Sequence, residues 1–419
     1  MSVALPAYAY SPVPSYAALP RPNEEDTVEY TPRQGRTTAQ FATITKEWRD
    51  VTIIFRNQET SSGPPTFGRN SSCCGEIGLE NSKDILTITL KLEGRISLSA
   101  SDCGSTVQKI VDQRRTIWDQ AESGRCPSVV GFAVAFPVTY TDQGRVCRLP
   151  PTYETICLGS PLLVVKCGYS LTIKITKART RKIGFWKTSS KTYTTNVVFR
   201  PRTRPARPIL ENPSFFSTVK AAPSEWLQMS ITIPTRKNAT LDPISCHFMI
   251  PSVQTFCFSE DIPFHIQLCG SLVSLREFYG SVSAEPRQQE ERPRKRQFAA
   301  IIRVFLARQV FVEINGRETW RNITVGEGKL RPIPPVASDG PDVNPSEASV
   351  DWEGEVRCKS DVNCASFNIS HLVVKDFIIL AITPANIRTS QMLPMQHAHP
   401  IRLVTDGWTD QDLVHPQDR

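Results

Sequence analysis

The sequence predicts an all-β protein built from two tandem antiparallel β-sandwiches, with flexible N- and C-terminal tails. Short apolar runs rich in β-branched residues recur along the chain, and Pro, Gly, Asn or Ser separate them. Few segments of useful length show the 3.6-residue period of an amphipathic helix. The 33 prolines among 419 residues suit turns and strand ends better than long helices.

The first sandwich is expected over residues 27–200, after a disordered Pro/Tyr-rich arm at 1–26. Its clearest strand is 169–176, where Leu171, Ile173 and Ile175 fall on one face and polar residues fall on the other. The best helical candidate is 106–120, because three of its apolar residues have helical spacing. These are Val107, Ile110 and Val111. Further strands of this series are expected at 51–55, 86–92 and 162–167.

A Pro/Arg-rich linker is expected at 201–223, because three prolines fall within residues 200–208 and exclude a central strand there. The second sandwich follows at 224–387, with long exposed loops at 284–297 and 326–349. Its expected strands lie at 227–233, 264–268, 300–306 and 377–382. The polar, Pro-containing residues 388–419 are predicted to form a flexible tail.

Composition argues against several classes of protein. Hydrophobic residues make up 40% and charged residues 21%, which is ordinary for a globular chain. No stretch approaches the roughly 18 apolar residues of a membrane-spanning helix. The first 20 residues have no basic segment followed by an apolar one, so no signal peptide is expected. The expected location is the cytoplasm, with peripheral attachment at the plasma membrane or endosomes as a further option.

No catalytic site, cofactor or metal is expected. The sequence has no Gly-rich phosphate loop, no G-x-S-x-G turn and no H-E-x-x-H motif. The 12 cysteines lack C-x-x-C spacing and are interpreted as reduced, mostly buried thiols. The densest Cys/His group matches no zinc template. It comprises Cys246, His247, Cys257, His265 and Cys269.

Positive charge is concentrated in one segment. Residues 155–210 contain 12 Lys or Arg and no Asp or Glu, whereas the whole chain has a net charge of +8. The segment 177–187 is expected to be a hairpin turn that contacts an anionic membrane or a protein cargo. The candidate residues are Lys177, Arg179, Arg181, Lys182, Trp186 and Lys187. The alternatives are a solvated hairpin face with Phe185 and Trp186 packed inward, a phosphorylated partner, and nucleic acid, which is disfavoured because no nucleic-acid-binding module is recognised.

Short proline–tyrosine motifs indicate docking to WW domains, in which proline favours an extended peptide that fits an aromatic groove. Leu5, Pro6 and Tyr8 belong to an L-P-x-Y motif, and Pro14 and Tyr16 form a looser match. A full P-P-x-Y match is the weaker candidate, because its tyrosine is expected to be a core residue. It contains Pro150, Pro151 and Tyr153.

Several phrases, in this order, resemble those of the arrestin superfamily, in particular the arrestin-like (alpha-arrestin-related) proteins of fungi. They are YTPR (30–33), ILTITLKLEGRI (85–96), TIW (116–118), FAVAFP (132–137), LPPTY (149–153), VFRPRTRP (198–205), FSEDIPFHI (258–266) and SFNIS (366–370). The turn at 259–261 departs from the family's basic-Gly pattern. No equivalent of the buried charged core of visual and receptor arrestins is recognised, so phosphate-triggered activation is not implied.

The resemblance implies immunoglobulin-like, arrestin-type sandwiches and a non-enzymatic adaptor. Such proteins link membrane-protein cargo to ubiquitination, endocytosis and intracellular trafficking, and they recruit WW-domain HECT ubiquitin ligases. The expected partners are therefore a ligase of that class and a membrane-protein cargo. The alternatives are a retromer-like structural sorting scaffold and a basic-loop protein that binds anionic membrane or nucleic acid.

Overall fold

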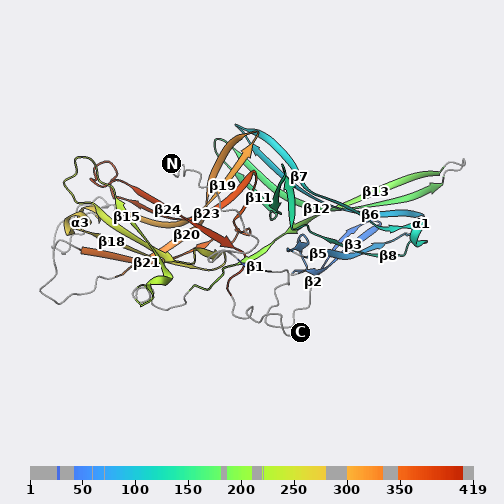
Figure 1. Cartoon of the computed structure of the whole chain (residues 1–419), viewed down its shortest axis with the longest axis horizontal. Helices are drawn as coiled ribbons and strands as arrows, with labels where there is room; N and C mark the ends of the chain where they lie inside the picture. The colour runs from blue at the N-terminus through green and yellow to red at the C-terminus, as the bar shows by residue number, and fades with distance from the viewer. Residues whose placement is uncertain are drawn as a thin grey trace, which may run out of the picture.

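Antiparallel β-strands form almost all of the regular structure, so the predicted all-β class is confirmed (Figure 1). The computed structural model describes residues 26–28, 42–58, 60–69, 71–180, 186–209, 219, 221–279, 300–333 and 348–408. Two large hydrophobic cores lie along the long axis of the molecule. The division into two independent tandem domains stays a prediction.

Two sheets form a sandwich around the first core. The four-stranded sheet contains, in order, β2 (Ala42–Trp48), β3 (Val51–Gln58), β5 (Ser72–Leu79) and β8 (Val129–Ala135). The six-stranded sheet contains β4 (Thr66–Phe67), β13 (Trp186–Phe199), β12 (Leu163–Thr180), β6 (Ile85–Ala100) and β7 (Gly104–Asp119), with β11 (Tyr153–Cys157) paired to β12. Trp48 of β2 packs edge-on against Tyr193 of β13, with ring centroids 5.6 Å apart.

The alternation predicted for β12 is confirmed. Leu171, Ile173 and Ile175 are at most 2% exposed, whereas Lys174 between them is exposed. Burying each of these apolar side chains contributes roughly 1.5–3 kcal/mol relative to leaving it in water. The period-2 pattern therefore determines which face of the strand lies against the core.

A ten-stranded sheet surrounds the second core. Its members, from one end, are β15 (Trp226–Ile233), β16 (Ile244–Pro251), β18 (Ile262–Gly270), β21 (Ala348–Cys358), β20 (Arg317–Ile333), β19 (Ile301–Ile314), β23 (Leu372–Thr383), β24 (Met395–Val404) and β17 (Thr255–Cys257), with β22 (Phe367–Ile369) paired to β23. Strands near both ends of this order, β16 and β24, contribute to one core, so the sheet curls around it. The helix α3 (Leu272–Tyr279) adds Leu275 and Phe278.

The remaining elements are short. They are β1 (Asp26–Val28), α1 (Gln120–Ser123), β9 (Thr139–Asp142), β10 (Arg145–Arg148), β14 (Arg202–Arg204) and the 3-10 helix η1 (Pro223–Glu225). Strands β9 and β10 form one two-stranded sheet, and β1 and β14 form another.

The second half of the chain contributes to the first core. Val310 and Val312 of β19, Ile369 of β22, and Leu372 and Val374 of β23 belong to the first hydrophobic cluster. Strands β19 and β23 contribute side chains to both cores and therefore join them, although both strands were predicted to belong to the second sandwich. The linker at 201–223 does not by itself separate the halves of the molecule.

The expected helix at 106–120 is wrong, because this segment lies in β7 and pairs with β6. Gly94 pairs with Val111 and Arg95 pairs with Lys109, so the extra residue Ile110 forms a β-bulge. A bulge interrupts the alternation of faces. Ile110 and Val111 are consequently both buried. Together with Val107, these adjacent apolar residues have the i, i+3, i+4 spacing of a helix, which explains the wrong prediction.

The expected flexible tail at 388–419 is wrong as far as residue 408. Strand β24 pairs with β23 from Ile401 opposite Asp376 to Met395 opposite Ile382. Within the predicted linker, β14 pairs with β1, and Arg202 makes a bidentate contact with Asp406 whose shortest distance is 2.7 Å. Residues 409–419 lie outside the described residues, as does the arm at 1–25.

The two long loops predicted in the second half are only partly tested. Residues 326–333 belong to β20 and residues 348–349 to β21, so the loop expected at 326–349 is wrong at both ends. Residues 334–347 and the whole loop at 284–297 lie outside the described residues. Strands β20 and β21 pair along residues 326–333, which explains why polar composition alone misplaced this boundary.

A buried ion pair holds β19, β23 and the segment before β22 together. Arg308 is 4% exposed and Asp376 is 1% exposed. Arg308 Nε and Nη2 donate to the Asp376 carboxylate at 2.8 and 3.0 Å, and Nη2 also donates to the Cys364 carbonyl at 2.8 Å. Ser366 Oγ donates to the same carboxylate at 2.6 Å. Burial favours the neutral guanidine, but Asp376 outweighs this effect and raises the pKa of Arg308.

We predict that Asp376→Leu alone will lower the free energy of unfolding by roughly 3–5 kcal/mol, because Arg308 would be left buried without its counter-ion. Chemical denaturation measures this change. Glu327→Ala is the matched surface control, because Glu327 pairs with Arg303 where both side chains are about half exposed, and it should cost less than about 1 kcal/mol. The double variant Arg308→Met/Asp376→Leu should recover much of the loss. A single variant no worse than the control would contradict this account.

Candidate functional site

The most distinctive surface feature is the basic hairpin arm, which we define as residues 177–180 of β12 and 186–191 of β13. Strand β12 pairs with β6 only as far as Lys177 opposite Ile85. Beyond that point β12 and β13 continue to pair with each other, to Thr180 opposite Trp186. The arm therefore leaves the sandwich and extends past its other strands (Figure 1).

The structure tests the placement of the predicted basic residues only in part. Lys177 and Arg179 lie on β12, and Trp186 and Lys187 lie on β13, with Arg179 directly opposite Lys187. Antiparallel pairing thus brings basic positions from both strands together. Arg181 and Lys182 lie outside the described residues. The inward packing considered for Phe185 and Trp186 stays untested.

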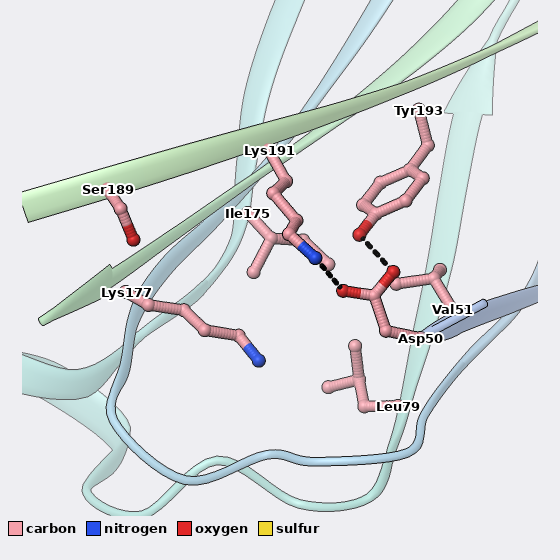
Figure 2. Close-up of a pocket in the computed structure, with 8 residues that line it drawn as sticks. All are labelled: Asp50, Val51, Leu79, Ile175, Lys177, Ser189, Lys191 and Tyr193. Atoms are coloured by element: carbon pink, nitrogen blue, oxygen red, sulfur yellow. Dashed lines mark hydrogen bonds and ion pairs between the residues drawn. The ribbon is translucent and has the colours of Figure 1, made fainter. Parts of the chain in front are cut away.

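An acidic residue from the opposite sheet holds the base of the basic hairpin arm. Asp50 lies in the turn between β2 and β3, and Figure 2 shows two side chains of β13 pointing at its carboxylate. Lys191 Nζ donates to Asp50 Oδ2 at 2.5 Å, and the Tyr193 hydroxyl donates to Asp50 Oδ1 at 2.7 Å. Lys177 Nζ donates to the Asn81 carbonyl at 2.9 Å. The two sheets are therefore tied together where the arm begins.

The electrostatics of this contact stabilise the charged carboxylate. The hydrogen bond from Lys191, and then that from Tyr193, lower the pKa of Asp50 below its ordinary value. Burial, and then the hydrogen bond to Asp50, raise the pKa of the Tyr193 phenol, so it remains a donor at neutral pH. A pocket of about 40 Å³ lies between Asp50, Lys177 and Lys191. It is large enough for a water molecule but not for an organic substrate.

The P-P-x-Y match at residues 150–153 is buried. Pro150 and Pro151 are buried, and Tyr153 is 7% exposed. The Tyr153 ring packs edge-on against Phe367 of β22, with centroids 5.6 Å apart. A WW domain needs an accessible proline and tyrosine, so the folded chain does not present this motif. Leu5, Pro6, Tyr8, Pro14 and Tyr16 all lie outside the described residues.

The cysteines of the chain are free thiols. Eight cysteines are buried, four are half-buried, and none forms a disulfide. Burial raises the pKa of the Cys246 and Cys358 thiols to about 12. No group of three His, Cys, Asp or Glu residues in the described chain could hold a metal ion. Among the same residues, no helix has the length and apolar character needed to cross a bilayer.

No protein-family model matches the chain, and no curated protein matches it. The resemblance to arrestin-like proteins therefore stays a prediction from the sequence.

Two structurally important contacts, Asp50 with Lys191 and Arg308 with Asp376, were not predicted from the sequence. Asp50 and Lys191 are 141 residues apart, and no local pattern connects them. For the buried ion pair a signal existed. Arg308 follows Val304 and Leu306 at the core-facing positions of its strand, and Asp376 holds the equivalent position between Val374 and Ile378. A charged residue at such a position needs a partner, and register places these two opposite each other.

We predict that Asp50→Asn will lower the free energy of unfolding by about 1 kcal/mol at neutral pH, because it removes the ion pair with Lys191. The folded-state pKa of Asp50 lies below the unfolded value of about 3.9. Its contribution is therefore present above that value and is lost as the pH falls through the folded pKa. Between about pH 5 and pH 2, the original chain should lose more stability than Asp50→Asn.

Thermal unfolding followed by circular dichroism across this pH range measures the difference. Asp361→Asn is the control, because Asp361 is exposed, and its acid dependence should match that of the original chain. Identical acid profiles for Asp50→Asn and the original chain would show that the contact with Lys191 and Tyr193 contributes nothing.

Proposed function

We propose that this protein is a non-enzymatic, arrestin-like adaptor that links membrane-protein cargo to ubiquitination and endocytosis. The basic hairpin arm is the cargo or membrane contact, and the segment containing Leu5, Pro6 and Tyr8 is the ligase contact. The sequence phrases that resemble arrestin-like proteins and the confirmed β-sandwich architecture both support this proposal.

The observation that carries the proposal is the construction of the basic hairpin arm. It extends beyond the sandwich, and its base is tied to the opposite sheet through Asp50. A partner could therefore contact it without rearranging either core. No acidic residue lies within 155–210, so the arm has no counter-charge of its own. Each Lys or Arg near an anionic membrane contributes about 1 kcal/mol to binding.

The burial of Tyr153 supports assigning ligase docking to the N-terminal motif. The P-P-x-Y tyrosine is a core residue, so its ring is needed for packing. The L-P-x-Y motif remains the better candidate for an extended peptide that a WW domain binds.

We predict that reversing three charges of the segment 177–187, with Arg179→Glu, Arg181→Glu and Lys182→Glu, will weaken binding to phosphatidylserine vesicles at least about a hundredfold. The estimate follows from about 1 kcal/mol per basic residue. Vesicle co-sedimentation at low salt measures the affinity. Arg114→Glu, Arg115→Glu and Lys237→Glu reverse three exposed charges elsewhere and form the control. Equal vesicle binding by both triple variants would contradict the assignment of the basic hairpin arm as the membrane contact.

We predict that a WW domain of a HECT ligase will bind the intact chain, and that Tyr8→Ala/Tyr16→Ala will lose this binding. Tyr153→Phe is the matched control, because phenylalanine preserves the ring that packs on Phe367. Isothermal titration with a purified WW domain measures all three affinities. If Tyr8→Ala/Tyr16→Ala still binds the WW domain and Tyr153→Phe does not, the docking site is at Tyr153. If the intact chain does not bind the WW domain, the ligase is removed from the proposal.

A further inference from the structure

A large cleft lies where the two cores meet, and none of the sequence-predicted binding residues on the hairpin arm lines it. Its volume is about 1080 Å³. One wall comes from β9, β10 and the segments that follow β4 and β13. The other comes from the β19–β20 hairpin, residues 363–370 and β24. A ligand in the cleft would therefore contact both halves of the chain.

The charged lining of the cleft is mainly basic. Five arginines and two glutamates line it, which gives a net charge of +3. They are Arg69, Arg145, Arg148, Arg200 and Arg402, with Glu313 and Glu318. These arginines lie on separate segments, and the fold brings them together. Arginine suits carboxylates because its planar guanidinium can donate two parallel hydrogen bonds.

Two of these arginines are available for a ligand. Arg145 and Arg200 are exposed, and in the described part of the chain neither side chain has an ion-pair or hydrogen-bond partner. Nearby arginines differ: Arg202 pairs with Asp406 at 2.7 Å, and Arg207 pairs with Glu225 at 3.2 Å. The cleft therefore keeps cationic groups that are not neutralised internally, and an anionic ligand would complement them.

Two short strands in the lining indicate the shape of the ligand. Strand β10 pairs only with β9, and β22 pairs only with β23, so each has one edge without a strand partner among the described residues. An extended peptide binds such an edge through backbone hydrogen bonds. Val146 of β10 is 74% exposed and can contact alternate apolar side chains of that peptide.

The cleft wall is preorganised by the buried ion pair. Arg308 holds the Cys364 carbonyl, and Asp376 accepts from Ser366, so the segment before β22 has a fixed course. Phe367 packs on Tyr153 of β11, which connects this wall to the first core. A rigid wall reduces the ordering cost of binding.

We propose that this inter-core cleft binds an extended acidic peptide segment of a partner protein, with its carboxylates on Arg145 and Arg200. The proposal deepens the adaptor function and rests on it, because it names the chemistry of a partner's segment. It places that contact at the junction of the cores and away from the basic hairpin arm.

Fluorescence anisotropy with the full chain tests the proposal. The probe is a labelled peptide of alternating Glu and Val, about ten residues long, which spans about 33 Å when extended. The matching Lys/Val peptide is the ligand control. We expect the Glu/Val peptide alone to bind, with an affinity that falls as salt is added. Arg145→Glu/Arg200→Glu should weaken binding at least about tenfold.

The protein control is Arg114→Glu/Arg115→Glu, which reverses the same number of charges on exposed positions of β7 that do not line the cleft. It should bind the Glu/Val peptide as the original chain does. Hydrogen exchange supplies a second readout, because the peptide should protect amides of residues 145–148 and 367–369. Equal weakening in both double variants, no protection at these strands, or no binding by the original chain would each overturn the proposal.

The same variants separate this proposal from the others. If the cleft variant loses phosphatidylserine vesicle binding but keeps the Glu/Val peptide, the cleft contacts lipid and the peptide proposal fails. If the peptide does not bind while the WW domain still does, the cleft assignment fails and the adaptor function stands. If the original chain binds neither the WW domain nor the vesicles, the proposed function itself fails.

Discussion

The structure depends on the buried pair of Arg308 and Asp376. Removing either partner would leave an unpaired charge in the core, so the two must stay together in the folded chain. The pair also determines the course of neighbouring backbone, because Arg308 holds the Cys364 carbonyl and Asp376 holds Ser366. Ser366 in turn accepts from the Leu403 backbone amide in β24 at 3.0 Å. One ion pair thus links β19, β23, β24 and one wall of the cleft.

Residues 150–153 show that a docking motif can be present in the sequence and yet be buried in the folded chain. Residues 150–153 match a WW-domain ligand, but Tyr169 donates a hydrogen bond to the Pro150 carbonyl at 2.5 Å, and Tyr153 packs on Phe367. A motif describes residue types, whereas recognition also needs exposure. Here Tyr153 and Phe367 both pack in the first core, so the Tyr153 ring contributes to stability.

Local pattern was sufficient for the β class and for strands such as β12, because alternation along a strand is local information. It failed at β7, where the bulge at Ile110 disturbed the alternation, and at β24, whose strand character depends on pairing with β23. The basic hairpin arm could be anticipated because residues 155–210 contain many Lys and Arg and no Asp or Glu. The cleft could not, because Arg69, Arg145, Arg200 and Arg402 come together only through tertiary packing.

The 12 basic residues of the segment 155–210 are one feature in the sequence, but the structure places some of them on the basic hairpin arm and Arg200 at the cleft. Strand β13, with 14 residues, separates Lys187 at the arm from Arg200 at the cleft, and a strand of that length spans about 45 Å. Beyond the cleft, Asp406 and Glu225 neutralise Arg202 and Arg207. A partner that contacts both surfaces would need its two acidic regions separated by a similar distance. Binding at one surface would then raise the effective concentration of the partner at the other.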